Sequence, residues 1–291
     1  PIRTGTDRMR ADQLLVERGM AASRSQAVRL ISGGMRWRDA GTDMPWREVV
    51  KNRDDLPESA ELELVDASES RYVSRGGLKL EGALQAAGID PTGLMCLDVG
   101  QSTGGFTDCL LQHGAAHVVG VDVGHGQLHA RLRDDARVSA IESVNARTLG
   151  AAHLLAATAT DTEVEGVFDA LVDPVFDLVV ADLSFISLTL VLPALVPFLA
   201  PEGRMLMLVK PQFELQPGQV GKGGIVRDAA MYAVVEQRLR DACAALDLRV
   251  VQWLDSPIAG GDGNHEFFIH AVHSGVTGST LGADRASTTE L

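Results

Sequence analysis

The chain has 291 residues, 45% of them hydrophobic, which is enough for two domains and a buried core. The formal net charge of −13 argues against a surface that binds nucleic acid over its whole extent. The longest apolar run, residues 188–200, contains Pro193 and Pro197 and is too short to cross a bilayer. The three cysteines lie far apart, which excludes a disulfide framework and zinc-type spacing, and no signal peptide is visible. We therefore expect a cytoplasmic protein with no membrane-spanning segment and no metal site.

The charge is distributed unevenly along the chain. Residues 1–53 carry 11 of the 26 Lys and Arg residues and 6 of the 39 Asp and Glu residues. This segment therefore has a net charge of +5, and the remainder has a net charge of −18. We call residues 1–66, which include the basic segment, the head, and the rest the body. A basic head on an acidic body indicates that the head has a partner of its own.

Two short helices are predicted in the head. The first covers residues 10–19 and ends in a glycine, and the second covers residues 24–32 and is followed by two glycines. Ser23 can cap the second helix. Two short helices with a tight link resemble a helix-turn-helix hairpin, and a strand is expected over residues 35–38. The arginines of the second helix and of this strand form a face suited to phosphate contacts. The alternative is an ordinary solvated basic surface.

Strands and helices alternate from residue 94 onward. Before this part, residues 52–70 are acidic and polar and predict a last strand of the head followed by a linker. The predicted strands end at Asp98, Asp122, about Ile141, Asp182 and Lys210, with two more over 249–254 and 266–273, and the predicted helices cover about 105–113, 127–133, 146–157, 187–199 and 229–246. Seven mostly parallel strands with helices between them predict a doubly wound sheet. The last two strands have no helix between them, so the final strand is expected to be antiparallel. A loop insertion is predicted over 150–175 and a disordered tail over 274–291.

The body is organised around one glycine-rich stretch, L-D-V-G-Q-S-T-G-G-F-T-D, over residues 97–108. A strand precedes it and a helix follows it, which is the entrance to a nucleotide-type pocket. The spacing fits neither G-x-G-x-x-G nor a phosphate-binding P-loop. Asp98 closes the first strand, and Asp122 closes the next strand, where such folds bind ribose hydroxyls; the alternative is that both acids only cap turns. Because glycine leaves room for a ligand, we expect a side chain at Gly104 to enter the ligand path.

Four charged residues are predicted to converge where the parallel strands end. Asp182 and Lys210 close two buried strands, Glu266 opens the final strand, and Lys79 comes from the helix before the first strand. A lysine that ends an apolar strand is costly unless a carboxylate is near, so two lysines and two acids would compensate each other. Ligands of open α/β sheets bind at this edge, which favours a catalytic cluster. A neutralising salt-bridge cluster is the alternative.

The head carries the run R-A-D-Q-L-L-V-E-R-G-M-A-A-S-R-S-Q-A-V-R-L-I-S-G-G over residues 10–34. This run resembles the small RNA-binding domain named after the S-four ribosomal protein, although the following M-R-W-R-D-A-G departs from the usual V-x-V-N-G. The resemblance implies that the second helix faces RNA. Together with the charge pattern, it gives the predicted RNA contacts Arg10, Arg24, Ser25, Arg29, Arg36 and Arg38.

The body carries, in order, S-R-G-G-x-K-L, D-V-G-x-S-T-G-G-F-T-D, V-D-V-G-x-G-Q-L, D-L-S-F-I-S, L-V-K-P-Q-F-E and G-N-x-E-F. These motifs resemble the FtsJ-type ribose 2′-O-methyltransferases, and residues 8–273 resemble the TlyA family of haemolysin-named ribosomal RNA methyltransferases. The resemblance implies a catalytic tetrad of Lys79, Asp182, Lys210 and Glu266. It also implies that S-adenosylmethionine is bound by Asp98, Gly100, Ser102, Thr103, Gly104, Gly105, Phe106, Asp122, Val123, Asn145 and Asp182. Two residues depart from the family pattern, because Gln101 replaces a usual small residue and His125 a usual tyrosine.

We therefore predict an α/β protein with a doubly wound, seven-stranded Rossmann-like methyltransferase sheet and a small N-terminal α+β RNA-binding domain. The predicted parts are an S-four-like domain over 1–66, a linker over 67–73, a methyltransferase domain over 74–273 and the tail. The predicted function is S-adenosylmethionine-dependent 2′-O-ribose methylation of ribosomal RNA, with ribosomal RNA or ribosomal subunits as partners and no membrane partner. Two alternatives come from other classes: a membrane-active haemolysin and a non-catalytic RNA-binding protein.

Overall fold

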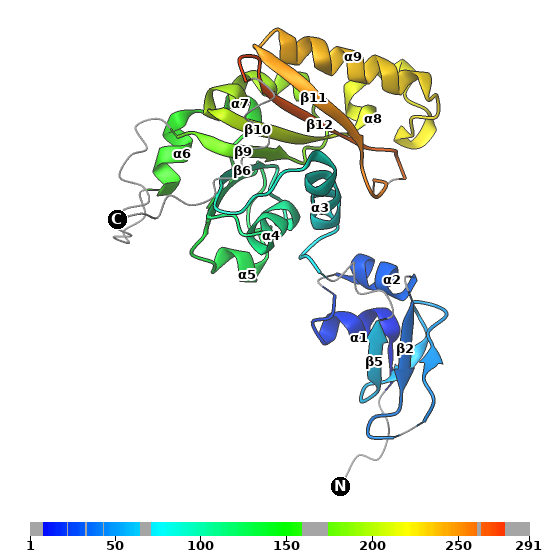
Figure 1. The fold of residues 1–291 in the computed structure, drawn as a ribbon. Helices are drawn as coiled ribbons and strands as arrows, with labels where there is room; N and C mark the ends of the chain where they lie inside the picture. Colours follow the sequence, from blue (N-terminus) through cyan, green and yellow to red (C-terminus); the bar gives the residue numbers. More distant parts are fainter. Residues whose placement is uncertain are drawn as a thin grey trace. The chain divides into compact units, whose positions relative to one another are not determined.

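The computed structural model describes residues 8–21, 23–32, 34–42, 44–64, 71–158, 174–260 and 263–276. The chain divides into two compact units, Pro1–Leu78 and Lys79–Leu291. In Figure 1 the described residues of the first unit run from blue to cyan and those of the second from cyan to red. The division falls within helix α3 (Gly76–Ala87), just after the predicted linker.

In the first unit, two helices accompany two small antiparallel sheets. The helices are α1 (Ala11–Glu17) and α2 (Arg24–Ser32), close to the predicted ranges. One sheet pairs β1 (Arg8–Arg10) with β4 (Asp55–Pro57), and the other has the order β3 (Arg47–Glu48), β2 (Met35–Arg38), β5 (Glu61–Leu64). Leu15, Leu30 and Met35 are among the side chains buried in the core of this unit. Strands β1, β3 and β4 have only two or three residues, too few to show an alternating pattern in the sequence.

The second unit is built on a seven-stranded sheet of order β11-β12-β10-β9-β6-β7-β8. The strands are β6 (Met95–Val99), β7 (His117–Val121), β8 (Val138–Ile141), β9 (Phe176–Ala181), β10 (Leu199–Val209), β11 (Leu248–Asp255) and β12 (Phe267–His273). Neighbours from β10 to β8 pair in parallel, whereas β12 is antiparallel to both β10 and β11. The predicted doubly wound sheet and its antiparallel last strand are confirmed.

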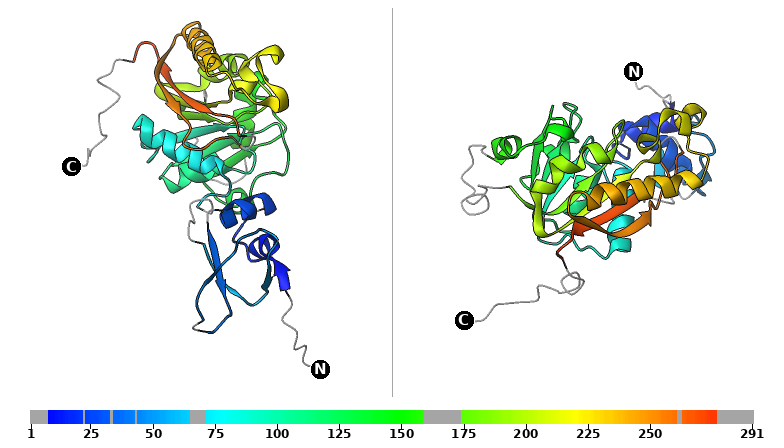
Figure 2. Two further views of the ribbon diagram at one scale, coloured as in Figure 1. Left: turned by 90° about the vertical axis from the view of Figure 1, so that its right-hand side faces the viewer. Right: turned by 90° about the horizontal axis from the view of Figure 1, so that it is seen from above.

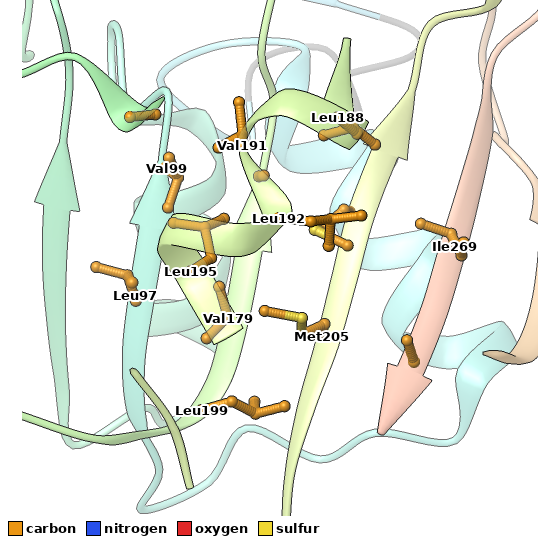
Figure 3. Close-up of a cluster of buried hydrophobic side chains, with 14 of the residues drawn as sticks. Leu97, Val99, Val179, Leu188, Val191, Leu192, Leu195, Leu199, Met205 and Ile269 are labelled. Atoms are coloured by element: carbon orange, nitrogen blue, oxygen red, sulfur yellow. The ribbon is translucent and has the colours of Figure 1, made fainter. Parts of the chain in front are cut away.

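Helices cover both faces of this sheet (Figure 2), because successive residues of each strand point to opposite sides. On one face Leu97, Val179 and Met205 pack against α7 (Leu192–Leu195) in a cluster that also includes residues of α9 (Ala230–Ala244), as Figure 3 shows for α7. On the other face, Phe268 stacks on Phe106 of α4 (Gly105–Gln112), with 6.1 Å between ring centroids. The remaining α-helices of the unit are α5 (Ala130–Arg133), α6 (Ala151–Thr158) and α8 (Pro211–Glu214).

The predicted helix over residues 187–199 is wrong. It is replaced by the 3₁₀ turn η3 (Leu188–Leu190), the single turn α7 and the 3₁₀ turn η4 (Val196–Phe198), and Leu199 already begins β10. Pro193 and Pro197 each lack a backbone donor and clash with the preceding turn, so a continuous helix cannot form there.

Two predicted segments lie largely outside the described residues. The predicted insertion over 150–175 begins with helix α6, but residues 159–173 are not described; the same holds for residues 277–291 of the predicted tail. Within the residues that the structure does describe, no helix combines the length and the apolar character needed to cross a bilayer. In this same part, no group of three or more His, Cys, Asp and Glu side chains is arranged to hold a metal ion.

Candidate active site

The sheet brings three of the four predicted tetrad residues to the ends of adjacent strands. Lys210 follows the last residue of β10 that pairs with β12, and Glu266 immediately precedes the first paired residue of β12. Asp182 follows β9, which pairs with the other side of β10. Lys79 comes from α3, the helix that precedes β6 in the chain. The strand order therefore explains why residues far apart in the sequence meet at one edge.

Two ion pairs join the tetrad. Lys79 Nζ lies 2.5 Å from Glu266 Oε2, and these side chains are 9% and 3% exposed. Lys210 Nζ lies 2.6 Å from Asp182 Oδ1 and donates a hydrogen bond to Ser184 Oγ at 2.9 Å. The side chains of Lys210 and Asp182 are 12% and 25% exposed. The first pair is thus buried, and the second is more accessible to a substrate.

Charge interactions join the two ion pairs into one cluster. Burial raises the pKa of Glu266, while the positive charges of Lys79 and Lys210 oppose this rise and the Asp182 carboxylate adds to it. Glu266 therefore interacts with all three other members of the tetrad. The predicted convergence is present in the structure, and the catalytic role of these residues stays a prediction.

Asp182 also connects the tetrad to the glycine-rich turn. Its backbone N–H donates to the carbonyl oxygen of Val99 at 3.0 Å. Gly100 has a φ of 86°, and a Cβ placed on it would lie 2.5 Å from the carbonyl oxygen of Asp182. Glycine is therefore required at position 100 so that the turn and the tetrad can lie against each other.

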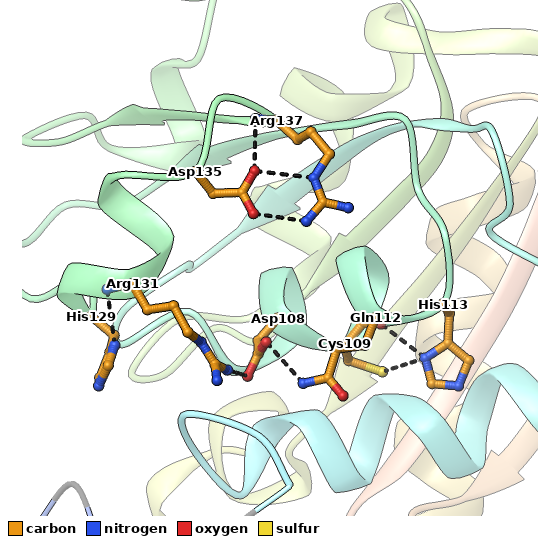
Figure 4. Close-up of polar contacts among 8 residues, drawn as sticks. All are labelled: Asp108, Cys109, Gln112, His113, His129, Arg131, Asp135 and Arg137. Atoms are coloured by element: carbon orange, nitrogen blue, oxygen red, sulfur yellow. Dashed lines mark hydrogen bonds and ion pairs between the residues drawn. The ribbon is translucent and has the colours of Figure 1, made fainter. Parts of the chain in front are cut away.

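Gly104 also has a positive φ, 95°, and neighbouring side chains give a further reason for glycine at this position. A Cβ on Gly104 would lie 2.3 Å from Leu132 Cδ1 and 2.8 Å from Leu128 Cδ1. A side chain here would therefore push against the segment that contains α5. The expectation that it also enters the ligand path stays a prediction. Figure 4 shows that Arg131 of α5 is joined to Asp108 of α4, at 2.6 Å, which fixes this segment beside the turn.

Below the turn, Asp98 is fully buried and belongs to a chain of hydrogen bonds. Thr107 Oγ1 donates to Asp98 Oδ2 at 2.7 Å, and Gln101 Nε2 donates to Thr107 Oγ1 at 2.9 Å. Among the described residues, no group forms a hydrogen bond with the buried Oδ1 of Asp98. Burial raises the pKa of Asp98 to about 7; the Thr107 hydrogen bond opposes the rise, and the Asp182 and Asp122 carboxylates add to it. A buried acceptor without a donor fits a ligand group that is cationic or hydroxylated.

Asp122, at the end of β7, holds two turns together. Its carboxylate accepts hydrogen bonds from the backbone N–H groups of Ser102, at 2.7 Å, and Gly124, at 2.6 Å. This matches the turn-capping interpretation, yet each carboxylate oxygen keeps a second lone pair for a ligand. The neighbouring Val123 side chain is 73% exposed, and Asn145 caps the 3₁₀ turn η2 (Ala146–Thr148) with its side chain.

The remaining predicted cofactor residues lie in or just after the turn. Thr103 accepts a backbone hydrogen bond from His129 at 3.2 Å, and Gly105 begins α4. Phe106 is 3% exposed and stacks on Phe268, so its ring belongs to the core, and its predicted part in cofactor binding stays a prediction. The apolar spacing of α4 already favours a core position for this ring.

Sequence reasoning missed an exposed aromatic side chain near the tetrad. Phe185 is 90% exposed, has a φ of 64°, and lies with its ring centroid 5.0 Å from that of Phe213. Glu214 anchors the loop that follows Phe185. The carboxylate of Glu214 accepts hydrogen bonds from Ser187 Oγ at 2.5 Å and from the Leu188 N–H at 2.7 Å. A phenylalanine in the loop Asp182-Leu183-Ser184-Phe185, which follows a buried strand, is the signal that could have identified this position.

In the first unit, two of the predicted RNA contacts share one carboxylate. Arg10 and Arg24 lie 2.8 Å and 3.2 Å from Asp12 Oδ2, and Asp12 is 2% exposed. Burial works to raise the pKa of Asp12, but the hydrogen bonds from both arginines outweigh it and hold the pKa below its ordinary value. Ser25 and Arg29 lie on α2, and their side chains are outside the described part of the structure.

The two predicted RNA contacts on β2 are paired within the sheet. Arg36 lies 2.9 Å from Glu63, and Arg38 lies 2.6 Å from Glu61, because β2 and β5 pair these residues directly. An anionic partner would have to compete with these glutamates. The structure thus favours the alternative of an internally compensated, solvated surface for this strand.

Comparison with known proteins identifies the family. Residues 72–272 match the FtsJ-like methyltransferase family. The chain is 44% identical over 262 residues to the 16S/23S rRNA (cytidine-2′-O)-methyltransferase TlyA of Mycobacterium tuberculosis, covering 90% of this chain and 89% of that protein. It is 35% identical to Hemolysin A of Brachyspira hyodysenteriae, covering 91% and 100% of the two chains. A solved structure of a hemolysin-named protein from Streptococcus thermophilus matches with a TM-score of 0.66 and 33% identity, covering 95% and 94%. The chain therefore belongs to the TlyA family of FtsJ-like methyltransferases.

Proposed function

We propose that this protein transfers a methyl group from S-adenosylmethionine to a ribose 2′-hydroxyl of ribosomal RNA. The observation that carries this proposal is the tetrad with its two ion pairs, one buried and one accessible, in contact with the glycine-rich turn through Asp182 and Gly100. The relative from Mycobacterium tuberculosis is named for cytidine 2′-O-methylation of 16S and 23S rRNA. The charged side chains of the tetrad and the glycine-rich turn thus suit a transfer of a methyl group to a ribose hydroxyl.

The residues around the turn suit the cofactor. Asp98 Oδ1 is a buried acceptor to which no described residue donates, and this fits the ammonium group of the methionine part. Asp122 has free lone pairs that can accept hydrogen bonds from the ribose hydroxyls. We expect the exposed side chains of Val123 and Asn145 to cover the adenine ring. When bound, the cofactor supplies a methyl group on a sulfonium, whose leaving group is already activated.

Lys210 is the residue that we expect closest to the reacting oxygen. A ribose hydroxyl is a poor nucleophile at neutral pH, so it must be positioned and its proton must be accepted. Lys210 Nζ is held by Asp182 and Ser184 at the more accessible end of the tetrad. A neutral Lys210 would act as a base, and a charged one would orient the oxygen.

We expect Phe185 to stack on the base of the target nucleotide, since exposed aromatic rings commonly bind unstacked RNA bases. Replacing Phe185 with alanine should lower kcat/KM for methylation by about 5- to 100-fold, as expected for a lost base stack. Affinity for S-adenosylhomocysteine, measured by calorimetry, should not change. Phe185→Trp keeps a stacking surface and should retain most activity. Equal methylation rates in Phe185→Ala and the parent would contradict this role.

The head is expected to supply RNA affinity. The structure argues against charge reversal at Arg24, because a glutamate would lie beside the buried Asp12. The neutral double variant Arg24→Gln, Arg29→Gln should weaken binding to ribosomal RNA and reduce the slope of log K against log salt by about 0.7 to 0.9 per lost phosphate contact. Filter binding at several salt concentrations measures both quantities. Arg137→Gln, which removes a guanidinium already paired with Asp135, is the control. An unchanged salt slope in the double variant would refute the assignment.

The proposal is tested by mapping 2′-O-methyl groups on ribosomal RNA. Purified protein, S-adenosylmethionine and unmethylated ribosomal subunits should give new 2′-O-methyl positions, and Lys210→Ala should give none. RNA binding without methylation would favour the non-catalytic alternative. Because a relative is named Hemolysin A, a liposome leakage assay with the same protein tests the membrane-active alternative. Leakage without methylation would overturn the proposal.

A further inference from the structure

A buried relay of three side chains leads from Gln101 to Asp98. Gln101 is 6% exposed, and both Thr107 and Asp98 are completely buried. Gln101 Nε2 donates to Thr107 Oγ1 at 2.9 Å, and Thr107 Oγ1 donates to Asp98 Oδ2 at 2.7 Å. The relay occupies one carboxylate oxygen of Asp98 and leaves the other, Oδ1, without a hydrogen bond in the described part of the chain.

The space for Gln101 depends on a glycine in the neighbouring strand. A Cβ placed on Gly120 of β7 would lie 2.0 Å from both Cδ and Nε2 of Gln101. The amide of Gln101 therefore fills a volume that only glycine at position 120 leaves free. Its backbone N–H is fixed as well, because it donates to the carbonyl oxygen of Val121 at 3.2 Å. Gln101 is thus part of a built site.

The direction of the relay is set by the charge of Asp98. An ionised carboxylate only accepts hydrogen bonds, so the single hydroxyl hydrogen of Thr107 must point to it. Without another donor, a threonine hydroxyl in a helix can turn to the carbonyl oxygen one turn earlier. The Gln101 amide donates to the Thr107 oxygen and keeps its hydrogen directed at Asp98. The relay therefore favours the ionised form of Asp98 in one orientation.

We propose that Gln101 is a positioning residue for the cofactor, which acts through Thr107 to hold Asp98 ionised with Oδ1 available to the cofactor's ammonium group. Gln101 itself does not touch the ligand. The inference rests on the proposed function, and it assigns a role to a residue at which this chain departs from the family pattern.

The pH dependence of cofactor binding follows from this arrangement. The pKa of Asp98 is raised to about 7, mainly by burial. The hydrogen bonds from Thr107 oppose this rise, and the carboxylates that face Asp98, Asp182 after β9 and Asp122 after β7, add to it. A cationic group binds the ionised form, so affinity should rise as pH increases through about 7. Loss of the Gln101 donor weakens the Thr107 hydrogen bond to the carboxylate. The pKa of Asp98 should then be higher, and affinity should rise only at a higher pH.

The test is calorimetric titration of the full chain with S-adenosylhomocysteine at several pH values. Gln101→Met keeps the length of the side chain but removes the donor. It should weaken binding at neutral pH by about 3- to 10-fold, the range for one hydrogen bond, and shift the pH profile upward. Binding of 5′-methylthioadenosine, which lacks the ammonium group, should not depend on residue 101. Gln112→Met is the matched control, because Gln112 is exposed at the end of α4, the helix that contains Thr107, and donates to Asp108.

A double-mutant cycle separates a relay from a general packing effect. Thr107→Val removes the hydroxyl, and once it is gone, Gln101→Met should cause no further loss of affinity. Thr107→Ser keeps the hydroxyl and should restore the parent's pH profile. If Gln101→Met does not fold, Gly120→Ala displaces the same amide and should give the same upward shift. Additive losses in the cycle, or an unchanged pH profile in a variant that binds S-adenosylhomocysteine, would overturn the inference. Failure of the parent to bind S-adenosylhomocysteine would instead overturn the proposed function.

Discussion

Replacing Lys210 with alanine is expected to abolish methyl transfer while cofactor and RNA remain bound. The lysine lies at the accessible end of the tetrad, 2.6 Å from Asp182, and its contact with the reacting oxygen matters most in the transition state. A general-base contribution is typically about 100- to 10,000-fold, so kcat should fall by that amount with little change in KM. Single-turnover methylation of ribosomal RNA measures this loss. The partly exposed Asp182 can be solvated when its partner is removed, so the variant should keep the parent's fold.

Two further variants distinguish the role of Lys210. Arginine keeps the positive charge but cannot lose a proton at neutral pH, so an active Lys210→Arg indicates a charged orienting group. An inactive Lys210→Arg indicates a base or a strict geometry. Calorimetry with S-adenosylhomocysteine is the control, since Lys210 should not affect cofactor affinity. A decrease of less than about tenfold in Lys210→Ala is too small for a general base and would move the assignment to another tetrad residue.

The sheet of the body could be predicted because its buried strands are continuous apolar runs that end in polar residues. The strands predicted to end at Asp98, Asp122, Asp182 and Lys210 are all present in the structure, and each ends within one residue of the predicted position. Pro193 and Pro197 break the helix that was expected over 187–199, and both are visible in the sequence. The prediction failed there because it used only the spacing of apolar residues. The shortest strands of the head depend on tertiary pairing and leave no local pattern.

The candidate site could be predicted only at the level of the sheet edge. The rule that ligands bind where parallel strands end brought Asp182, Lys210 and Glu266 together, but it gives no side-chain partners. The pairing of Lys79 with Glu266 depends on the position of α3, which no sequence pattern determines. The packing around Gly104 and Phe106 could not be predicted either, because their neighbours come from distant segments of the chain.

The buried pair of the tetrad should have a large effect on stability. Lys79 and Glu266 are almost fully buried, so removing one partner leaves an uncompensated buried charge. Lys79→Met should lower the free energy of unfolding by about 3 to 5 kcal/mol at neutral pH. Adding Glu266→Gln should recover most of this loss, because no charge is then left unpaired. Urea unfolding followed by the fluorescence of Trp253, in a background where Trp37 and Trp46 are phenylalanine, reports on the body.

The loss of stability caused by Lys79→Met should increase as the pH rises from acidic to neutral. Burial already raises the pKa of Glu266, and without the Lys79 charge the pKa rises further. Below the unfolded pKa of a glutamate, about 4.3, Glu266 is protonated in both states and its ionisation contributes no penalty. As pH increases toward the raised folded pKa, the unfolded state ionises first, so the variant loses stability relative to the parent. Arg240→Met, which breaks a half-buried helical pair with Glu236, should cost only about 0.3 to 0.5 kcal/mol. A deficit in Lys79→Met that stays constant between low and neutral pH would show that Glu266 does not carry the charge.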